Sequence, residues 1–252
     1  MYFETHAHYD DKAFDEDRDA VLASLADSNV NKVIIPGCDI KSTNKARDIS
    51  EKYPFVYFAA GIHPEEIAGI SLDDVSEVSS LAEHDKCVAI GEIGLDYYWE
   101  SENKTEQMRL FEFQMQLAYE MKMPVIIHDR EAHKDTFDII KNYPEVKGVF
   151  HCYSGSAEMA ELILKQGYYL GFDGPITYKN NVKSIDVLKM CPPERILIET
   201  DSPYLSPVPM RGQRNDSRNL RYIVEKIAEI KNLGTEEIET ITYENAKACF
   251  NL

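Results

Sequence analysis

Short β-rich stretches that alternate with helical patterns constrain the fold of this chain more than any other feature of its sequence. The stretches recur at intervals of roughly 20–35 residues, and a helical pattern lies between most of them. Strands that alternate with helices pair in parallel, and eight such units close into a barrel. The sequence therefore predicts an α/β protein built as a single (β/α)8 TIM barrel over residues 1–252. The predicted strands are Tyr2–His6, Val33–Pro36, Val56–Gly61, Val88–Glu92, Pro124–His128, Gly148–His151, Tyr168–Phe172 and Ile196–Thr200.

The helical patterns place apolar residues three or four positions apart, as one face of a helix requires. An alternative for alternating strands and helices is an open doubly wound sheet, which would carry a glycine-rich phosphate loop after its first strand. His6 and His8 stand at the end of the first predicted strand instead of such a loop, so the barrel is favoured. The clearest helical repeats are Leu110, Phe113, Leu117 and Met121, and Leu220, Ile223, Ile227 and Ile230.

Composition narrows the class of protein. The formal net charge of −17 disfavours nonspecific coating of nucleic acid, which uses basic surfaces, but it does not exclude an enzyme that processes nucleic acid. No apolar run is long enough for a membrane span, and the N-terminus lacks the pattern of a secretory signal. Five scattered cysteines fit neither a disulfide framework nor a zinc module. We therefore expect a cytoplasmic protein with no membrane partner and no obligate protein partner.

Histidines and carboxylates stand at the predicted strand ends where barrel enzymes carry their chemistry. His6 and His8 are two positions apart, so their side chains point to the same side of an extended segment. Such a pair suits zinc or manganese, although it is as common among ordinary polar residues. The other strand ends favour the metal, because four histidines and two carboxylates can hold two ions that share a carboxylate. The further candidates are His63, Glu92, His128, His151 and Asp201.

Longer motifs surround these candidates in a fixed order. They are Thr5-His6-Ala7-His8, Gly61-Ile62-His63-Pro64, Gly91-Glu92-Ile93-Gly94-Leu95-Asp96, Pro124-Val125-Ile126-Ile127-His128, His151-Cys152-Tyr153-Ser154-Gly155, Glu199-Thr200-Asp201-Ser202-Pro203-Tyr204-Leu205 and Arg211-Gly212-Gln213-Arg214-Asn215. In this order and spacing they resemble the TatD-family metal-dependent deoxyribonucleases, within the amidohydrolase-like metallo-hydrolases. The resemblance covers essentially the whole chain. The sequence departs from the family at Asp216-Ser217, where an acidic residue followed by proline is usual. This difference affects the expected conformation of the loop and not the metal site.

The resemblance implies a function and a role for each candidate. It implies a divalent-metal-dependent hydrolase, above all an exonuclease-like deoxyribonuclease that cleaves phosphodiester bonds at DNA single strands or ends with a metal-activated water. Asp201 would also accept the proton of that water. His63 and Arg130 would contact the substrate phosphate. One metal ion would be held by His6, His8 and Asp201 and the other by His128 and His151, with Glu92 as the bridge.

Several alternatives stay open at the level of sequence. The same pair of ions could attack an ester or amide, as in an aminoacyl-tRNA deacylase, and the ions could be magnesium, manganese or zinc. Glu199 could serve a further metal or an ion pair, and Asp96 could order its loop or support a ligand. Arg211 and Arg214 could touch substrate or pin the loop that contains them. Trp99 could stack on a base or pack at the rim.

Overall fold

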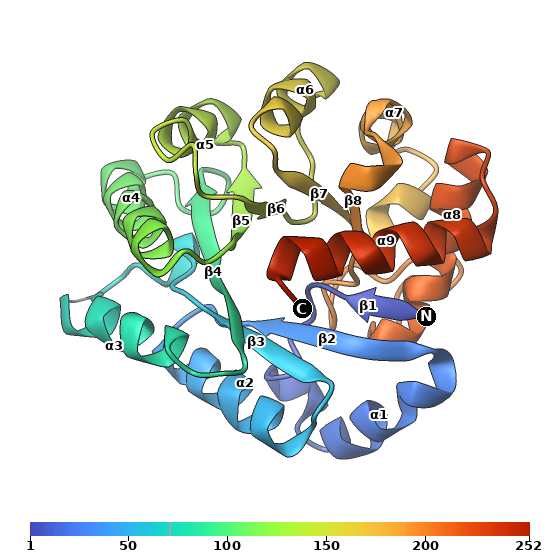
Figure 1. The fold of residues 1–252 in the computed structure, drawn as a ribbon, viewed down its shortest axis with the longest axis horizontal. Coiled ribbons are helices and arrows are strands. Elements are labelled where there is room, and N and C mark those ends of the chain that lie inside the picture. The colour runs from blue at the N-terminus through green and yellow to red at the C-terminus, as the bar shows by residue number, and fades with distance from the viewer. Residues whose placement is uncertain (71) are drawn as a thin grey trace.

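The strands pair in chain order, each parallel to the next, from β1 to β8 (Figure 1). The computed structural model describes residues 1–70 and 72–252. Helices follow the strands and cover the outside of the ring, so the chain is a (β/α)8 TIM barrel, as predicted. The strands are β1 (Tyr2–Glu4), β2 (Val30–Pro36), β3 (Val56–Ala60), β4 (Cys87–Asp96), β5 (Val125–Arg130), β6 (Gly148–Phe150), β7 (Tyr169–Phe172) and β8 (Ile196–Ile198).

The outer helices bury one face each against the strands. The α-helices are α1 (Arg18–Ser24), α2 (Ile40–Lys52), α3 (Leu72–Ala82), α4 (Lys104–Met121), α5 (His133–Ile140), α6 (Ala157–Lys165), α7 (Val182–Met190), α8 (Leu220–Lys231) and α9 (Thr235–Phe250). In α4, Leu110 and Leu117 are buried as predicted, but Phe113 is 49% exposed. The expectation for Phe113 is wrong because the buried stripe of α4 runs through Phe111 and Gln114 instead.

Several strands end at other residues than the sequence predicts, and this changes how the functional side chains are held. β4 continues to Asp96, so Glu92 lies inside the strand and not at its end. Gly94 lets β4 approach β5 closely, because it has a φ of +147° and a Cβ atom there would stand 1.9 Å from the carbonyl oxygen of His128. β1 and β6 are shorter than predicted, so His6 and His151 lie in the segments that follow them.

The ring closes between β1 and β8 through contacts around their ends. The backbone N–H of Asp201 donates a hydrogen bond to the carbonyl oxygen of His6, at 2.9 Å. The carboxylate of Glu4 is fully buried and accepts hydrogen bonds from the backbone N–H of Thr200 at 2.8 Å and from its hydroxyl at 2.7 Å. Glu4 thus fastens together two segments that each carry candidate metal ligands.

Replacing Glu4 with alanine is expected to lower the free energy of unfolding by about 2–4 kcal/mol, because buried donors at this seam lose their acceptor. Glu4→Gln should cost less than half as much, since the amide keeps an acceptor for the N–H of Thr200 and can donate to its hydroxyl. Urea unfolding followed by circular dichroism measures both variants. Equal losses would show that the hydrogen bonds of Glu4 do not matter.

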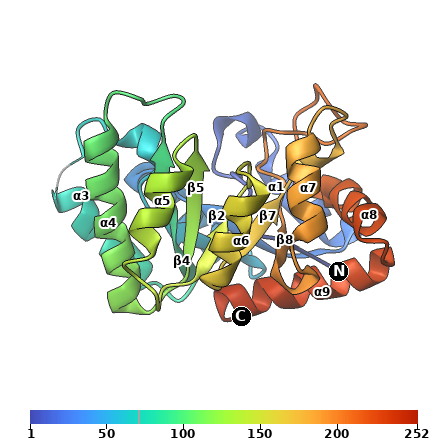
Figure 2. The same cartoon turned by 90° about the horizontal axis from the view of Figure 1, so that it is seen from above.

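The last helix closes one end of the barrel. Figure 2 shows α9 lying across the N-terminal ends of the strands, away from the loops that follow them. Its residues Ala246, Cys249 and Phe250 pack against Phe3 and Leu197, which point into the barrel. The open end is therefore the C-terminal one. None of the described helices is long and apolar enough to cross a membrane.

Candidate metal centre

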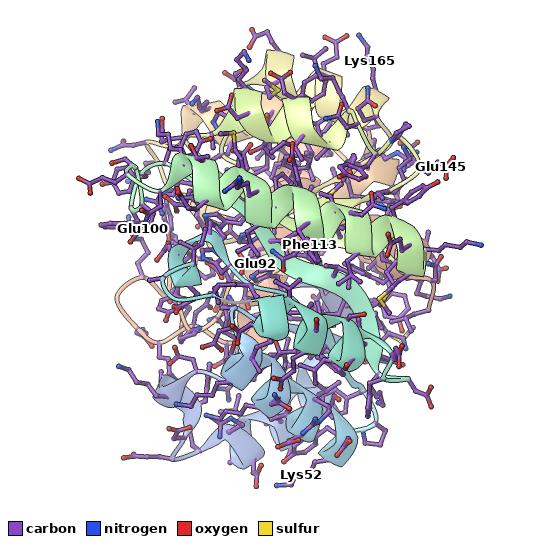
Figure 3. The ribbon with its side chains drawn as sticks, turned by 90° about the vertical axis from the view of Figure 1, so that its left-hand side faces the viewer. Lys52, Glu92, Glu100, Phe113, Glu145 and Lys165 are labelled. Carbon is purple, nitrogen blue, oxygen red and sulfur yellow. The ribbon has the colours of Figure 1, made fainter. Side chains whose placement is uncertain are left out.

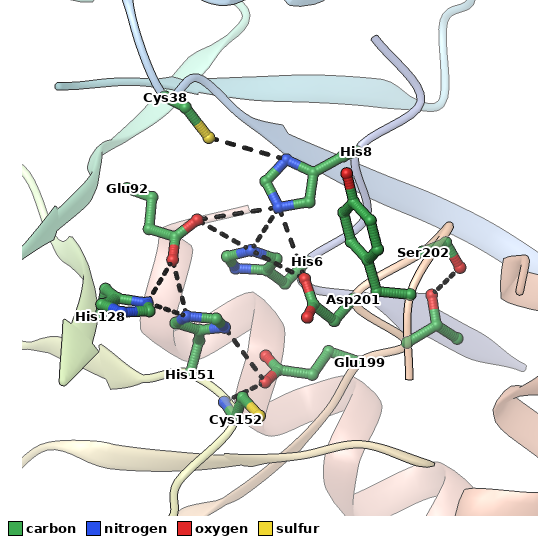
Figure 4. A network of polar contacts seen from close by, with 12 residues as sticks. His6, His8, Cys38, Glu92, His128, His151, Cys152, Glu199, Asp201 and Ser202 are labelled. Carbon is green, nitrogen blue, oxygen red and sulfur yellow. Dashed lines mark hydrogen bonds and ion pairs between the residues drawn. The ribbon is translucent and has the colours of Figure 1, made fainter. Parts of the chain in front are cut away.

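The predicted metal ligands meet at the open end of the barrel, around the single carboxylate of Glu92 (Figure 4). Glu92 is 3% exposed and belongs to β4. His128 comes from β5, whereas the other ligands come from the segments after β1, β6 and β8. A pocket of about 620 Å³ opens over them. Parallel topology explains the convergence, because the C-terminal ends of all strands lie at one end of the barrel.

The two oxygens of Glu92 divide the histidines into two pairs. Oε2 lies 3.2 Å from Nε2 of His6 and 3.8 Å from Nε2 of His8. Oε1 lies 3.0 Å from Nδ1 of His128 and 2.7 Å from Nε2 of His151. Within the pairs, the facing nitrogens are 3.2 Å apart for His6 and His8, and 3.3 Å apart for His128 and His151. Each carboxylate oxygen therefore faces one pair of these candidate ligands, and Oε1 also lies 3.4 Å from Nε2 of His63.

Asp201 belongs with the first pair. Its Oδ1 lies 3.5 Å from Nε2 of His8 and 3.7 Å from Nε2 of His6. Its φ of +53° is unusual for a residue with a side chain, and a positive φ is shared by Leu205 in the same loop and by Cys152 in the loop after β6. Backbone strain of this kind collects at functional sites, where the surrounding structure holds a side chain in a required position.

The donor set and its spacing fit divalent cations. Imidazole nitrogens combined with carboxylate oxygens suit zinc, manganese and related ions. Two ligands that are each about 2.1 Å from one ion lie roughly 3.0–3.6 Å apart. The separations around each oxygen of Glu92 are mostly of this size, so each pair can share an ion with that oxygen.

The histidines of the ring differ in protonation when no cation is bound. Burial opposes the charged form of His8, but Cys38 and a hydrogen bond to Asp201 raise its pKa well above the usual value. Burial opposes ionisation of Glu92, but the imidazoles of His151 and His6 hold its pKa well below its usual value. Burial lowers the pKa of His6 to about 4, so its ring is neutral and can bind a cation. Burial also disfavours the charged form of His128, yet hydrogen bonds to Asp96 and Glu92 raise its pKa to about 10. A cation at His128 must therefore displace a proton.

Asp96, the last residue of β4, both supports a ligand and orders a loop. Its Oδ2 lies 3.0 Å from Nε2 of His128, which leaves Nδ1 of that ring facing Glu92. Its Oδ1 accepts hydrogen bonds from the backbone N–H groups of Tyr98 and Trp99, each at 2.8 Å. One buried carboxylate thus links the orientation of His128 to the course of the loop between β4 and α4.

Two further buried carboxylates lie beside the ring. Glu199 accepts a hydrogen bond from the backbone N–H of Cys152, and its Oε1 lies 3.8 Å from Nδ1 of His151. Gly171 makes room for it, because a Cβ atom there would stand 2.6 Å from both oxygens of Glu199. Asp173 is 3% exposed, and burial together with nearby Asp201 raises its pKa to about 8. Sequence reasoning missed Asp173, although its place directly after a predicted strand could have identified it.

His63 also faces Glu92, but the hydrogen bonding of its ring differs from that of the candidate ligands. Its Nε2 lies 3.4 Å from Oε1 of Glu92. Its Nδ1 accepts a hydrogen bond from the backbone N–H of Glu65 at 3.2 Å, so the neutral ring carries its hydrogen on Nε2. Nε2 is then a donor, which suits an acceptor on a substrate better than a cation.

The three arginines that the sequence suggests as substrate contacts make different interactions in the structure. Arg130 is exposed at the pocket, and its guanidinium lies over the rings of Tyr98 and Trp99, 4.5 Å and 5.6 Å from their centroids. Arg214 forms an ion pair with Asp17 at 2.7 Å and so pins the loop after β8. Arg211 lies 4.1 Å from the ring centroid of Tyr178.

The barrel and its ring of histidines and carboxylates are those of a metal-dependent hydrolase. The chain belongs to the TatD family, because the family described as TatD related DNase matches residues 3–251.

Relatives agree with this assignment. The chain is 41% identical over 254 residues to the uncharacterized metal-dependent hydrolase YabD of Bacillus subtilis, with 100% of both chains covered. It is 33% identical to the uncharacterized metal-dependent hydrolase YcfH of Escherichia coli, which covers 99% of this chain and 95% of the relative. The crystal structure of YjjV, a TatD homolog from Escherichia coli, superposes with a TM-score of 0.94 at 29% identity, covering 100% of this chain and 98% of the other.

Proposed function

We propose that the protein is a deoxyribonuclease that uses two divalent ions to hydrolyse phosphodiester bonds at single strands or ends of DNA. The observation that carries the proposal is the division of the two Glu92 oxygens between two pairs of histidines. A carboxylate whose two oxygens each face a pair of candidate ligand nitrogens suits two neighbouring cations better than one. The description of the family as TatD related DNase supports DNA as the substrate.

The residues of the ring fit the following assignment. Bound there, two divalent ions would activate a water and stabilise the charge of a phosphodiester. The histidine-rich donor set favours manganese or zinc, whereas magnesium prefers oxygen ligands but supports phosphoryl chemistry in many enzymes. One ion would be held by His6, His8 and Asp201 and the other by His128 and His151, with Glu92 shared between them.

The other roles belong to side chains that act on the substrate and the water. Burial opposes ionisation of Asp201, but its hydrogen bond to His8 lowers its pKa, so the carboxylate can accept the proton of the attacking water. His63 would donate from Nε2 to a phosphate oxygen. The exposed guanidinium of Arg130 would grip a phosphate with two donors.

An aminoacyl ester is the second candidate substrate, and the acidic lining of the pocket favours it. The acidic side chains at the mouth of the pocket would repel a polyphosphate and attract an ammonium group, such as that of an aminoacyl ester on tRNA. An aminoacyl-tRNA deacylase is therefore the alternative function. The acidic residues that line the pocket mouth are Asp10, Asp11, Asp39, Glu65 and Glu66.

A hydrolysis assay separates the two functions. Protein stripped with EDTA and reloaded with magnesium, manganese or zinc is incubated with labelled single-stranded DNA, duplex DNA, RNA and aminoacyl-tRNA. We expect metal-dependent cleavage of single-stranded DNA, and no cleavage by an Asp201→Ala variant purified in the same way. Equal cleavage by that variant would expose a contaminating nuclease. Deacylation without cleavage of DNA would replace the proposed function with the alternative.

Replacing one histidine should empty one metal position before the other. His8→Ala and His128→Ala are each expected to weaken the binding of a single metal ion about 10–100-fold or more. Each change removes a nitrogen that faces only one oxygen of Glu92. Elemental analysis after dialysis measures the metal content of each variant. His84→Ala is the matched control, since His84 lies at the surface beside Glu51. Simultaneous loss of both ions from either variant would contradict separate positions.

A further inference from the structure

The mouth of the candidate metal centre is divided by charge. The segments after β1, β2 and β3 contribute only acids among its charged side chains, from Asp10 to Glu66, apart from the histidines of the centre. The adjoining side, formed by the ends of β4 and β5, contributes Trp99 and Arg130. Arg130 is the one lysine or arginine among the described residues that line this pocket. A strand of DNA that reaches the centre is therefore repelled from the first side and attracted to the second.

The second side carries two neighbouring exposed aromatic side chains, of which Trp99 lines the pocket. Trp99 is 61% exposed and Tyr98 is 55% exposed. Their rings meet edge to face with centroids 4.7 Å apart, and the guanidinium of Arg130 lies over both. Large aromatic side chains normally bury most of their surface, so the exposed ring of Trp99, which lines the pocket, is available as a contact surface for a ligand.

The aromatic pair is held in a fixed relation to the metal centre. The buried carboxylate of Asp96 binds the backbone N–H groups of Tyr98 and Trp99 through one oxygen and reaches His128 through the other. The side-chain amide of Gln107 donates to the carbonyl oxygens of Asp96 and Glu100 at 2.9 Å and 2.7 Å, which braces the same loop from α4. A group that rests on Trp99 is thereby placed at a defined position beside His128.

We propose that Trp99, together with Tyr98 and Arg130, forms a stacking subsite for one unpaired nucleobase next to the phosphodiester bond that is cleaved. The inference rests on the proposed nuclease function. Every base has a π-face and stacks on an aromatic ring whatever its sequence, and an adjacent guanidinium adds a cation–π contact or binds the neighbouring phosphate. A base inside a duplex has both faces covered by its neighbours, so the subsite accepts only a single strand or a frayed end.

Trp99 is the only tryptophan of the chain, which makes its fluorescence a direct probe of the subsite. Wild-type protein loaded with magnesium is titrated with a phosphorothioate-linked tetrathymidylate, which resists hydrolysis. The same backbone with abasic residues and a blunt DNA hairpin serve as comparisons. We expect quenching by the base-bearing strand, with at least tenfold weaker binding and little quenching for the other two. Equal quenching by the abasic strand, or none by any ligand, would overturn the subsite.

Kinetics provide a second readout with a matched control. Trp99→Ala is expected to raise KM for single-stranded DNA about tenfold or more, with kcat changed less than threefold, and Trp99→Phe should recover most of the loss because it keeps an aromatic face. Phe113→Ala removes an aromatic that is 49% exposed from the outer side of α4 (Figure 3) and should leave both constants unchanged. A normal KM in Trp99→Ala would overturn the subsite.

The outcomes separate the subsite from the function on which it rests. A wild-type protein that cleaves none of the oligonucleotides would refute the proposed function, and the fluorescence titration would still decide whether bases stack on Trp99. Cleavage of DNA without base-dependent quenching would refute the subsite and leave the nuclease function in place.

Discussion

Glu92→Ala is expected to abolish hydrolysis and to remove both metal ions. Glu92 directs one oxygen to each pair of histidines, so its loss takes one oxygen from each position. It also leaves the imidazoles without the anion that they surround. Because metal ions supply several kcal/mol of transition-state stabilisation, kcat/KM should fall about a thousandfold or more. Elemental analysis and the single-stranded DNA assay measure the two effects on one preparation.

The control for this change is Glu66→Gln. Glu66 is an exposed acid that lines the same pocket without belonging to the ring. The variant should keep its metal content and its rate within a few-fold of wild type. If Glu92→Ala retained both ions, Glu92 would not be their bridge. Melting temperatures of both variants check that any loss reflects the site and not the fold.

Asp201→Asn is expected to lower kcat about 100- to 10,000-fold, the range in which general acid–base catalysis contributes. The amide keeps the shape of the side chain and one oxygen beside His8, but it cannot accept a proton. The affinity for the metal ion near His6 and His8 should therefore fall less in Asp201→Asn than in Asp201→Ala. Rates and metal content measured on both variants separate the role of Asp201 as a base from its role as a ligand.

Asp11→Asn is the matched control, because Asp11 lines the same pocket and binds the hydroxyl of Tyr204 at 3.0 Å without facing a histidine of the ring. It should change kcat less than threefold. An Asp201→Asn variant that kept more than a tenth of the wild-type kcat would show that another group accepts the proton.

Reading the ends of the predicted strands identified most of the ring, because parallel topology sends every C-terminal end to one side of the barrel. The same reading was least accurate where contacts with distant residues decide the boundary of a strand. Glu92 lies within β4 because the strand runs on along β5 to Asp96, and that pairing involves residues more than thirty positions away in the chain. Phe113 satisfied a helical spacing but lies beside the buried stripe, since spacing alone does not choose between adjacent faces of α4.

The sequence by itself determined the barrel, the kinds of candidate metal ligands and their order around it, because strand alternation and residue identity are local properties. Tertiary structure alone decided which oxygen of Glu92 faces which pair of histidines, and that Nε2 of His63 is a donor. It also placed Asp173 beside Asp201 and bound the loop of Trp99 to the carboxylate that reaches His128. These features depend on side-chain directions and on contacts between distant segments, which only the closed barrel brings together.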